Sequence, residues 1–215
     1  VEAMRHAYVD RNTALGDPDF VKNPVEKLTS KGYAESIRAG IDPYHAGVSA
    51  ELTPAGFGES TETTHYSIVD KDGNAVAVTY TLNGSFGTGK VAEGTGILLN
   101  NEMDDFTMKP GVPNLYGLVQ GEANAIEPGK SPLSSMSPTI VSKDGKPFMV
   151  IGSPGGSRII TITLEAIMNV IDHGMDLQEA IDAPRVHHQW LPDRVYIEPR
   201  ALSPDTLRIL AGQGY

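Results

Sequence analysis

The chain has 215 residues, of which 40% are hydrophobic and 20% are charged, a balance typical of a globular protein with enough chain for one large or two small domains. Its 17 basic and 27 acidic side chains give a formal net charge of -10, which argues against a general nucleic-acid binder, and no apolar run is long enough to span a bilayer. The absence of cysteine excludes a disulfide scaffold, a thiolate zinc site and a cysteine nucleophile.

The first 62 residues are predicted to be helical and then loop-like. Residues 1–12 favour one helix, and residues 24–39 favour two more, the second of them with Ser30 as its N-cap. Between them, residues 16–20 have the composition of a turn. From residue 40 to residue 62 the apolar periodicity stops and Gly, Pro, Ser and Thr dominate, which predicts a loop or flexible connector.

Two β-hairpins are predicted after residue 62. Residues 64–70 and 75–82 are rich in β-branched and aromatic residues, and the turn between them contains Asp-Gly, a strong hairpin signal. Residues 137–142 and 147–152 repeat this pattern around a second Asp-Gly turn. Two antiparallel hairpins indicate a sheet.

The C-terminal third is predicted to be mainly helical. Residues 155–157 open a helix that ends near Gly174, and its apolar residues line more than one face, so we expect it to be buried, packed against the sheet. A short helix follows Asp176, residues 194–198 are strand-like, and Ser203 precedes a last helix with proline at its first position. This succession of strands, helices and a further strand predicts an α+β layered domain.

Three polar segments each leave two interpretations open. Residues 100–106 follow an apolar segment that is expected to be a buried strand, and they set three carboxylates beside two amides, as in a solvated turn or in a site for an ammonium group. The hydroxyls of residues 133–138 either cap a turn or donate to an anion. Residues 153–157 form either a tight turn or a backbone N–H site for an anion or oxyanion at a helix N-terminus.

Other motifs in the sequence give weaker indications of function. Residues 84–90 fit the phosphate-loop pattern G-x-x-x-x-G-K, but Val91 stands where magnesium would need Ser or Thr, so nucleotide binding is not expected. The six histidines lack the i, i+4 spacing of a metal pair, which favours packing and backbone contacts over metal binding. Nothing in the periodicity distinguishes Thr63 from an ordinary strand residue.

Short segments spread over almost the whole chain are each weak signals but form a specific combination. They are residues 15–21, 62–67, 79–83, 86–89, 98–106, 109–114, 132–138, 152–157 and 169–192. In this order they strongly resemble the gamma-glutamyltranspeptidase (glutathione hydrolase) family of N-terminal-nucleophile hydrolases. The resemblance implies that the α+β chain is part of an αββα four-layer sandwich.

The resemblance also implies a self-cleaving precursor. In this family the chain cuts itself directly before a threonine, and the matching residue is Thr63, so the scissile bond would join Glu62 and Thr63. Residues 1–62 would then be the C-terminal end of the large subunit, and residues 63–215 a catalytic small subunit that lacks its last strands. A threonine hydroxyl needs an adjacent base, and a freed α-amino group with a pKa of about 7.7–8.0 is suitable.

Further site roles follow from the same resemblance. Thr81 would hydrogen-bond the nucleophile, and Gly155 and Gly156 would form the oxyanion hole. The segment 109–121 would be a lid, with Tyr116 as its gating aromatic. The groups expected to hold the α-amino and α-carboxylate groups of a γ-glutamyl substrate are Asn83, Glu102, Asp105, Ser134 and Ser135.

The implied reaction is acyl transfer from glutathione or a related γ-glutamyl amide, through a γ-glutamyl ester of Thr63, to water or to an amino acid or peptide acceptor. The resemblance implies no metal or organic cofactor. The implied partner is the rest of the large subunit, which would supply an arginine for the α-carboxylate and one sheet, so these 215 residues alone are expected to be inactive. Bacterial members of the family are periplasmic or secreted, and this is the expected localisation.

The sequence leaves two alternatives open. One is a related hydrolase that acts on poly-γ-glutamate or on a cephalosporin side chain. The other is a non-catalytic binding or assembly subunit that keeps the fold but is never cleaved.

Overall fold

The computed structural model describes residues 1–49 and 63–215, which form two compact units. The first unit contains residues 1–49, 104–133 and 183–215, and the second contains residues 63–103 and 134–182. The first unit therefore combines residues from both sides of the bond before Thr63. The predicted connector is described only up to residue 49, and its remainder lies outside the described residues.

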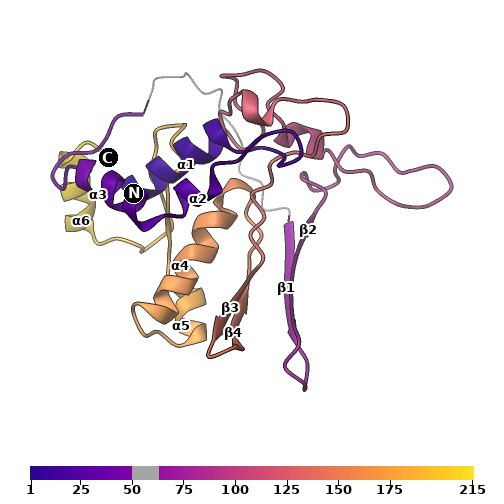
Figure 1. Ribbon diagram of the computed structural model, residues 1–215. Coiled ribbons are helices and arrows are strands. Elements are labelled where there is room, and N and C mark those ends of the chain that lie inside the picture. The colour runs from indigo at the N-terminus through magenta and orange to yellow at the C-terminus, as the bar shows by residue number, and fades with distance from the viewer. Residues whose placement is uncertain (50–62) are drawn as a thin grey trace. The chain divides into compact units, whose positions relative to one another are not determined.

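Helices at both ends of the chain form much of the first unit (Figure 1). They are α1 Glu2–Ala14, α2 Val25–Leu28, α3 Lys31–Gly40 and α6 Pro204–Gly212. The Ser30 side chain accepts a hydrogen bond from the backbone N–H of Tyr33 at 3.2 Å, as predicted for the N-cap of α3. Ser203 caps α6 in the same way. The sequence signals for these helix starts are confirmed.

A short sheet and a 3-10 helix complete the first unit. Strands β5 Val186–His187 and β6 Tyr196–Ile197 pair antiparallel, so the predicted strand at residues 194–198 is present but shorter. The 3-10 helix η2 spans Glu122–Asn124. Tyr8 of α1 is 2% exposed, and its ring meets the imidazole of His187 edge-on, with 5.6 Å between the ring centroids. Aromatic packing thus joins α1 to β5.

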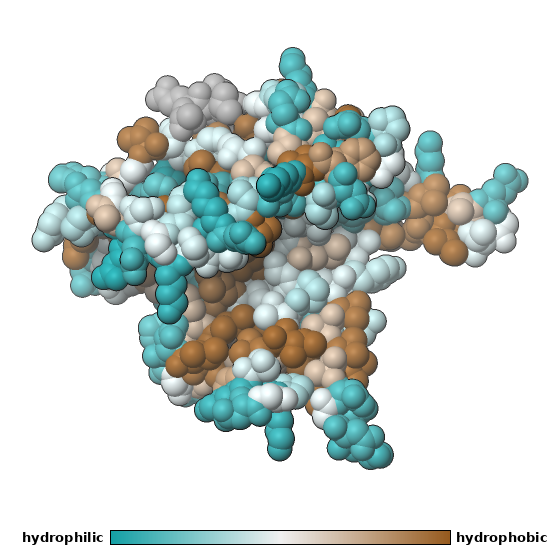
Figure 2. Space-filling view, viewed as in Figure 1, coloured by the Kyte–Doolittle hydropathy of each residue, from teal (hydrophilic) through white to brown (hydrophobic). Residues whose placement is uncertain are grey.

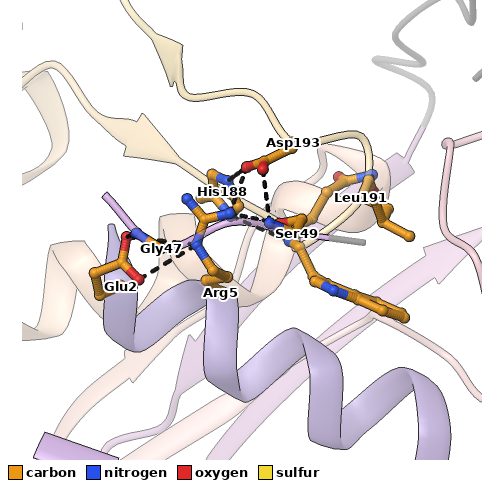
Figure 3. A network of polar contacts seen from close by, with 9 residues as sticks. Glu2, Arg5, Gly47, Ser49, His188, Leu191 and Asp193 are labelled. Carbon is orange, nitrogen blue, oxygen red and sulfur yellow. Dashed lines mark hydrogen bonds and ion pairs between the residues drawn. The ribbon is translucent and has the colours of Figure 1, made fainter. Parts of the chain in front are cut away.

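A buried polar network fixes the segment just before residue 50 (Figure 3). Arg5 of α1 pairs with Glu2 and with Asp193, and it donates to the Ser49 hydroxyl. The backbone N–H of Ser49 donates to Asp193 at 2.8 Å, and that of Gly47 donates to Glu2 at 3.3 Å. These contacts join α1, residues 47–49 and the loop after β5. We call Glu2, Arg5, Ser49, His188 and Asp193 the Arg5 network.

His188 is fully buried and completes the Arg5 network. Its Nδ1 accepts from the backbone N–H of Trp190, so Nε2 carries the proton and donates to Asp193. Burial and the nearby Arg5 charge lower the pKa of His188, which favours the neutral ring. Burial raises the pKa of Asp193, but the hydrogen bonds from Ser49, Arg5 and His188 outweigh it, and the pKa lies below its ordinary value.

The second unit is built on two antiparallel hairpins (Figure 1). The first joins β1 Thr63–Val69 to β2 Ala75–Thr81, and the second joins β3 Thr139–Lys143 to β4 Lys146–Ile151, as predicted. Strand β4 contacts both β1 and β2, and β3 contacts β2. The first residue of β1 pairs with the last residue of β2, so Thr63 faces Thr81 across the hairpin.

The main helix of the second unit is less buried than predicted. The turn η3 Gly156–Arg158 leads into α4 Ile159–Ile171, which packs against α5 Leu177–Asp182. Leu164, Met168 and Ile171 of α4 are 47%, 39% and 53% exposed, so the prediction that this helix is buried is wrong for these residues. Its apolar face extends beyond the side that α5 covers, and Figure 2 shows hydrophobic side chains gathered over α4.

The apolar segment 96–99 is also not the buried strand that was expected. It bonds back to residues 88–92, with a bridge between Val91 and Leu98 and a hydrogen bond from Thr88 N–H to the Leu99 carbonyl at 2.9 Å. Ile97 is 63% exposed and Leu99 is 44% exposed. The segment pairs locally instead of entering a sheet.

Within the described ranges, no helix combines the length and apolar character needed to cross a bilayer.

Candidate functional site

Thr63 begins β1, and its hydroxyl is held from the opposite strand. Directly paired residues of an antiparallel ladder point to the same face, so the side chains of Thr63 and Thr81 meet. The Thr63 hydroxyl donates to Thr81 Oγ1 at 3.2 Å, and the same oxygen accepts from the backbone N–H of Asn83 at 3.0 Å. Thr81 Oγ1 therefore orients the hydroxyl of Thr63 and links it to Asn83, just after the end of β2.

Asn83 is buried in an uncommon backbone conformation just after β2. It is 2% exposed and has a φ of 72°, a region that asparagine tolerates better than most residues. Its side-chain amide donates to the Asn101 carbonyl at 3.2 Å, and the Gly84 N–H donates to Asn101 Oδ1 at 2.8 Å. Sequence reasoning did not assign a role to Asn101, and the available signal was its place beside Glu102 in a polar segment.

The two predicted ammonium-binding carboxylates lie at the ends of the 3-10 helix η1 Glu102–Asp105. Glu102 belongs to the second unit, and its backbone N–H donates to Asn100 Oδ1 at 2.9 Å. Asp105 belongs to the first unit, where its carbonyl accepts from Asn124 Nδ2 at 2.7 Å and from Gln120 Nε2 at 3.1 Å. The fully buried Asn124 thus fixes the backbone at Asp105.

Ser134 and Ser135 lie in the second unit, ahead of β3. Ser134 is exposed, and its hydroxyl accepts from the backbone N–H of Met136 at 3.1 Å, which is the turn-capping interaction considered for this segment. The Ser135 carbonyl accepts from the Ser137 hydroxyl at 3.1 Å. A hydroxyl that accepts a bond still has a proton to donate, so capping and anion binding are compatible at Ser134.

The glycine turn, residues 152–156, connects β4 to η3 and α4. Gly155 has a φ of 134° and Gly156 a φ of 56°, values that an L-residue with a side chain rarely adopts. Glycine here permits the sharp change from strand to helix. It also leaves backbone N–H groups at the start of the helical segment, where they are suited to stabilise a developing negative charge.

The segment predicted to be a lid is anchored at its C-terminal end in the first unit. Leu118 is 2% exposed, and its N–H donates to Asn114 Oδ1 at 3.0 Å. The Gly121 N–H donates to the Asn12 carbonyl of α1 at 2.8 Å. Tyr116 is half-buried, and its carbonyl accepts from Gln189 Nε2 at 2.9 Å. The hydrogen bonds at Tyr116 and Gly121 therefore tie the C-terminal part of residues 109–121 to α1 and to Gln189.

The predicted residues are divided between the units. Asp105 and Tyr116 lie in the first unit. The second unit contains Thr63, Thr81, Asn83, Glu102, Ser134, Ser135, Gly155 and Gly156. Glu62 lies outside the described residues. Among the residues that the structure describes, no cluster of three or more His, Asp or Glu side chains is arranged to hold a metal ion.

Comparison with known families assigns the chain. The profile of the family described as gamma-glutamyltranspeptidase matches residues 1–215. The chain belongs to this family. The glutathione hydrolase proenzyme of Pseudomonas sp. (strain A14) is 66% identical over 215 residues, which are 100% of this chain and 37% of the relative. The chain thus spans little more than a third of the length of this glutathione hydrolase proenzyme.

Solved structures agree with this assignment. A crystal structure of a gamma-glutamyltranspeptidase mutant from Helicobacter pylori matches with a TM-score of 0.69 and 60% identity, over 71% of this chain and 82% of that chain. A cephalosporin acylase from Bacillus halodurans matches with a TM-score of 0.78 and 30% identity, over 100% of this chain and 36% of that chain. The mixed helix and strand fold is that of the N-terminal-nucleophile gamma-glutamyltranspeptidases and acylases.

The hydroxyl of Thr81 gives a first test of the expected role of Thr63. Thr81→Val keeps the shape of the side chain but removes the oxygen that accepts from Thr63 and from the Asn83 N–H. In the full-length protein we expect kcat for a γ-glutamyl anilide to fall about tenfold or more, because Thr63, the expected nucleophile, loses its orientation. Thr81→Ser should retain most of the activity. Equal kcat values for the Val and Ser variants would contradict this role.

Proposed function

We propose that the full-length protein transfers γ-glutamyl groups from glutathione and related amides to water or to amino acid and peptide acceptors. The acyl group passes through an ester on Thr63, formed after the chain has cut itself between Glu62 and Thr63. The observation that carries the proposal is the position of Thr63, a half-buried hydroxyl at the first residue of β1 that is oriented by Thr81. Membership of the gamma-glutamyltranspeptidase family supports it.

The cut creates the base that the later chemistry needs. In the precursor the Thr63 nitrogen is an amide, which cannot take up a proton. Attack of Thr63 Oγ1 on the Glu62 carbonyl transfers the acyl group from nitrogen to oxygen, and water then hydrolyses the ester. The freed α-amino group, with an ordinary pKa of about 7.7–8.0, can now accept the proton of the neighbouring hydroxyl.

Acyl transfer then uses the glycine turn. Thr63 Oγ1 attacks the γ-carbonyl of the substrate, and the backbone N–H groups of Gly155 and Gly156 stabilise the oxyanion. Loss of one such donor costs about 10²–10³ in rate. The leaving amine takes the proton held by the α-amino group, and water or an acceptor amine releases the γ-glutamyl group.

Recognition of the γ-glutamyl end falls to the polar groups around these residues. Glu102 and Asp105 would hold the substrate ammonium together with Asn83, and Ser134 and Ser135 would donate to its carboxylate. Tyr116 would close over the bound group. The proposal also includes the fold, an αββα four-layer sandwich in which the hairpins supply strands and α4 belongs to a helical layer. We further propose that the protein is periplasmic or secreted. Its partner would be the remaining large-subunit sequence.

A second candidate is an acylase of the same fold. It is supported by the fold match to a cephalosporin acylase over the whole chain. The carboxylates of Glu102 and Asp105 favour a substrate with a free ammonium group, and therefore favour the γ-glutamyl transfer reaction over this alternative.

The decisive experiment is expression of the full-length gene followed by intact mass spectrometry and an assay with a γ-glutamyl anilide. We expect two chains, the smaller one beginning at Thr63, and release of the aniline. Cleavage with turnover of a cephalosporin amide alone would support the acylase. A single intact chain without activity would support a binding subunit and contradict the proposal.

A further inference from the structure

The imidazole of His65 lies on the same face of β1 as Thr63. The two residues are separated by one position of the strand, so their side chains project to the same side, and His65 faces Thr79 just as Thr63 faces Thr81. His65 Nδ1 is 2.9 Å from Thr79 Oγ1, and Nε2 is 3.0 Å from Ser67 Oγ. Both ring nitrogens therefore have hydroxyl partners that fix the plane of the ring.

The ring of His65 occupies the space beside Gly152, the first residue after β4. A Cβ atom built on Gly152 would lie 2.3 Å from Cε1, 2.4 Å from Nδ1 and 2.9 Å from Nε2 of the imidazole. All three distances are shorter than a van der Waals contact, so no side chain fits at Gly152 while the ring remains in place. The ring of His65 on β1 thus lies directly against Gly152 at the start of the glycine turn, in addition to the contacts between β1 and β4.

We propose that His65 is a positioning residue whose ring, seated on Gly152, sets the separation between β1 and the glycine turn. β1 carries Thr63 Oγ1, and the glycine turn carries the backbone N–H groups of residues 155 and 156. The imidazole therefore fixes the position of the oxyanion donors relative to the nucleophile. The inference rests on the proposed function. It adds to it a residue that does not itself touch the substrate.

The environment of the ring agrees with such a spacer. Burial lowers the pKa of His65, which keeps the imidazole neutral at pH 7. A neutral ring between two hydroxyls is satisfied in either tautomer, because each hydroxyl can donate or accept. The ring can therefore remain in one position whether or not charge develops at the reacting atoms nearby.

The test is a double-mutant cycle in the full-length protein with His65→Ala, Gly152→Ala and the double variant. The readouts are kcat and KM for a γ-glutamyl anilide, measured per cleaved chain. Gly152→Ala should lower kcat by about 10²-fold, because the methyl group must displace the ring or the turn. His65→Ala should lower kcat by about tenfold and leave KM within about threefold, because binding groups stay in place while the donors shift.

The double variant decides the inference. With the ring removed the methyl group fits, so kcat should recover to within about threefold of that of His65→Ala alone, a strong departure from additivity. Losses that simply multiply would overturn the inference, and so would an unchanged kcat in His65→Ala, which remains informative even if Gly152→Ala does not fold. Gly32→Ala, an open position of α3, is the control for an added methyl group and should leave kcat unchanged.

Failure of this inference is distinguishable from failure of the proposed function. A wild-type protein that is neither cleaved nor active contradicts the proposed function itself. A wild-type protein that is cleaved and active, combined with multiplicative losses in the cycle, contradicts only the role of His65.

Discussion

Replacing Thr63 by alanine is expected to leave the full-length precursor as one uncut chain, with turnover of a γ-glutamyl anilide reduced by about 10⁴-fold or more. The substitution removes the atom that makes the first attack on each of the two carbonyls in the proposed mechanism. It also prevents release of the α-amino group, because the cut that frees this base requires the same oxygen. Intact mass spectrometry reports the first effect, and aniline release reports the second.

Two matched variants separate chemistry from structure. Thr63→Ser keeps the hydroxyl and should still be cut and retain activity. Thr64→Ala alters the next residue of β1, which is exposed, pairs with Tyr80 and points to the other face of the hairpin from Thr63. This variant should be cut, and its activity should lie within about twofold of wild type. Cleavage of the Thr63→Ala precursor at the same bond would show that another group is the nucleophile.

Local signals in the sequence were enough to predict most elements. Ser30 and Ser203 marked helix starts because a side-chain oxygen satisfies an N–H that the helix leaves unpaired. Asp-Gly turns marked both hairpins because glycine accepts the backbone twist of a tight turn. These are interactions among neighbours in the chain, and they need no knowledge of the rest of the molecule.

Predictions that depended on distant contacts were less successful. Apolar residues of α4 and of the segment 96–99 were expected to be buried because hydrophobic composition was the only guide, yet burial depends on what packs against them. The Arg5 network could not be predicted, since Arg5 and Asp193 are far apart in the sequence. The same holds for the contact between His65 and Gly152.

The candidate site depended more on resemblance than on pattern. Thr63 is an ordinary β-branched residue at the start of a strand, and only the family pattern distinguished it from its neighbours. The carboxylates at residues 102–105 were visible as an unusual polar cluster, and only the family resemblance suggested a ligand for it. Asn101 was missed because an amide that holds backbone groups has no signature in one sequence.

The composition of the first unit has a consequence for the cleaved protein. Residues on both sides of the proposed cut pack together there: Tyr8 meets His187, the Asn12 carbonyl accepts from Gly121, and Arg5 pairs with Asp193. After cleavage these contacts become contacts between two chains. The cleaved chains should therefore stay associated through the first unit, with the Arg5 network as the charged part of that association.

Arg5→Met is expected to destabilise the first unit by about 3 kcal/mol or more, because it leaves the carboxylates of Glu2 and Asp193 without the cation that compensates them. Thermal unfolding should be measured in the uncut Thr63→Ala precursor, so that chain dissociation does not enter the transition. Arg5→Lys keeps the charge but cannot bridge the same acceptors, and should fall between wild type and Arg5→Met. The exposed pair of Lys71 and Asp72 provides the control, since Asp72→Asn should cause no measurable change.

The destabilisation caused by Arg5→Met should depend on pH in a definite direction. The pKa of Asp193 is lowered in the folded protein, so its contribution is complete above its ordinary pKa of about 3.9 and is lost as the pH falls through the folded value. The pKa of Glu2 is lowered as well: burial raises it, while hydrogen bonds from Tyr215 and Gly47 and the charge of Arg5 outweigh that effect. Once both carboxyls are protonated, Arg5 has no charged partner to stabilise. Because the charge of Arg5 helps to lower the pKa of the buried His188, the difference in unfolding temperature between the Thr63→Ala precursors with and without Arg5→Met should begin to narrow as the pH falls below the ordinary His pKa of about 6.5, where His188 can take up a proton in the Arg5→Met protein. It should narrow further below about pH 4. A difference that stays constant down to pH 2 would mean that Arg5 stabilises the unit by packing alone.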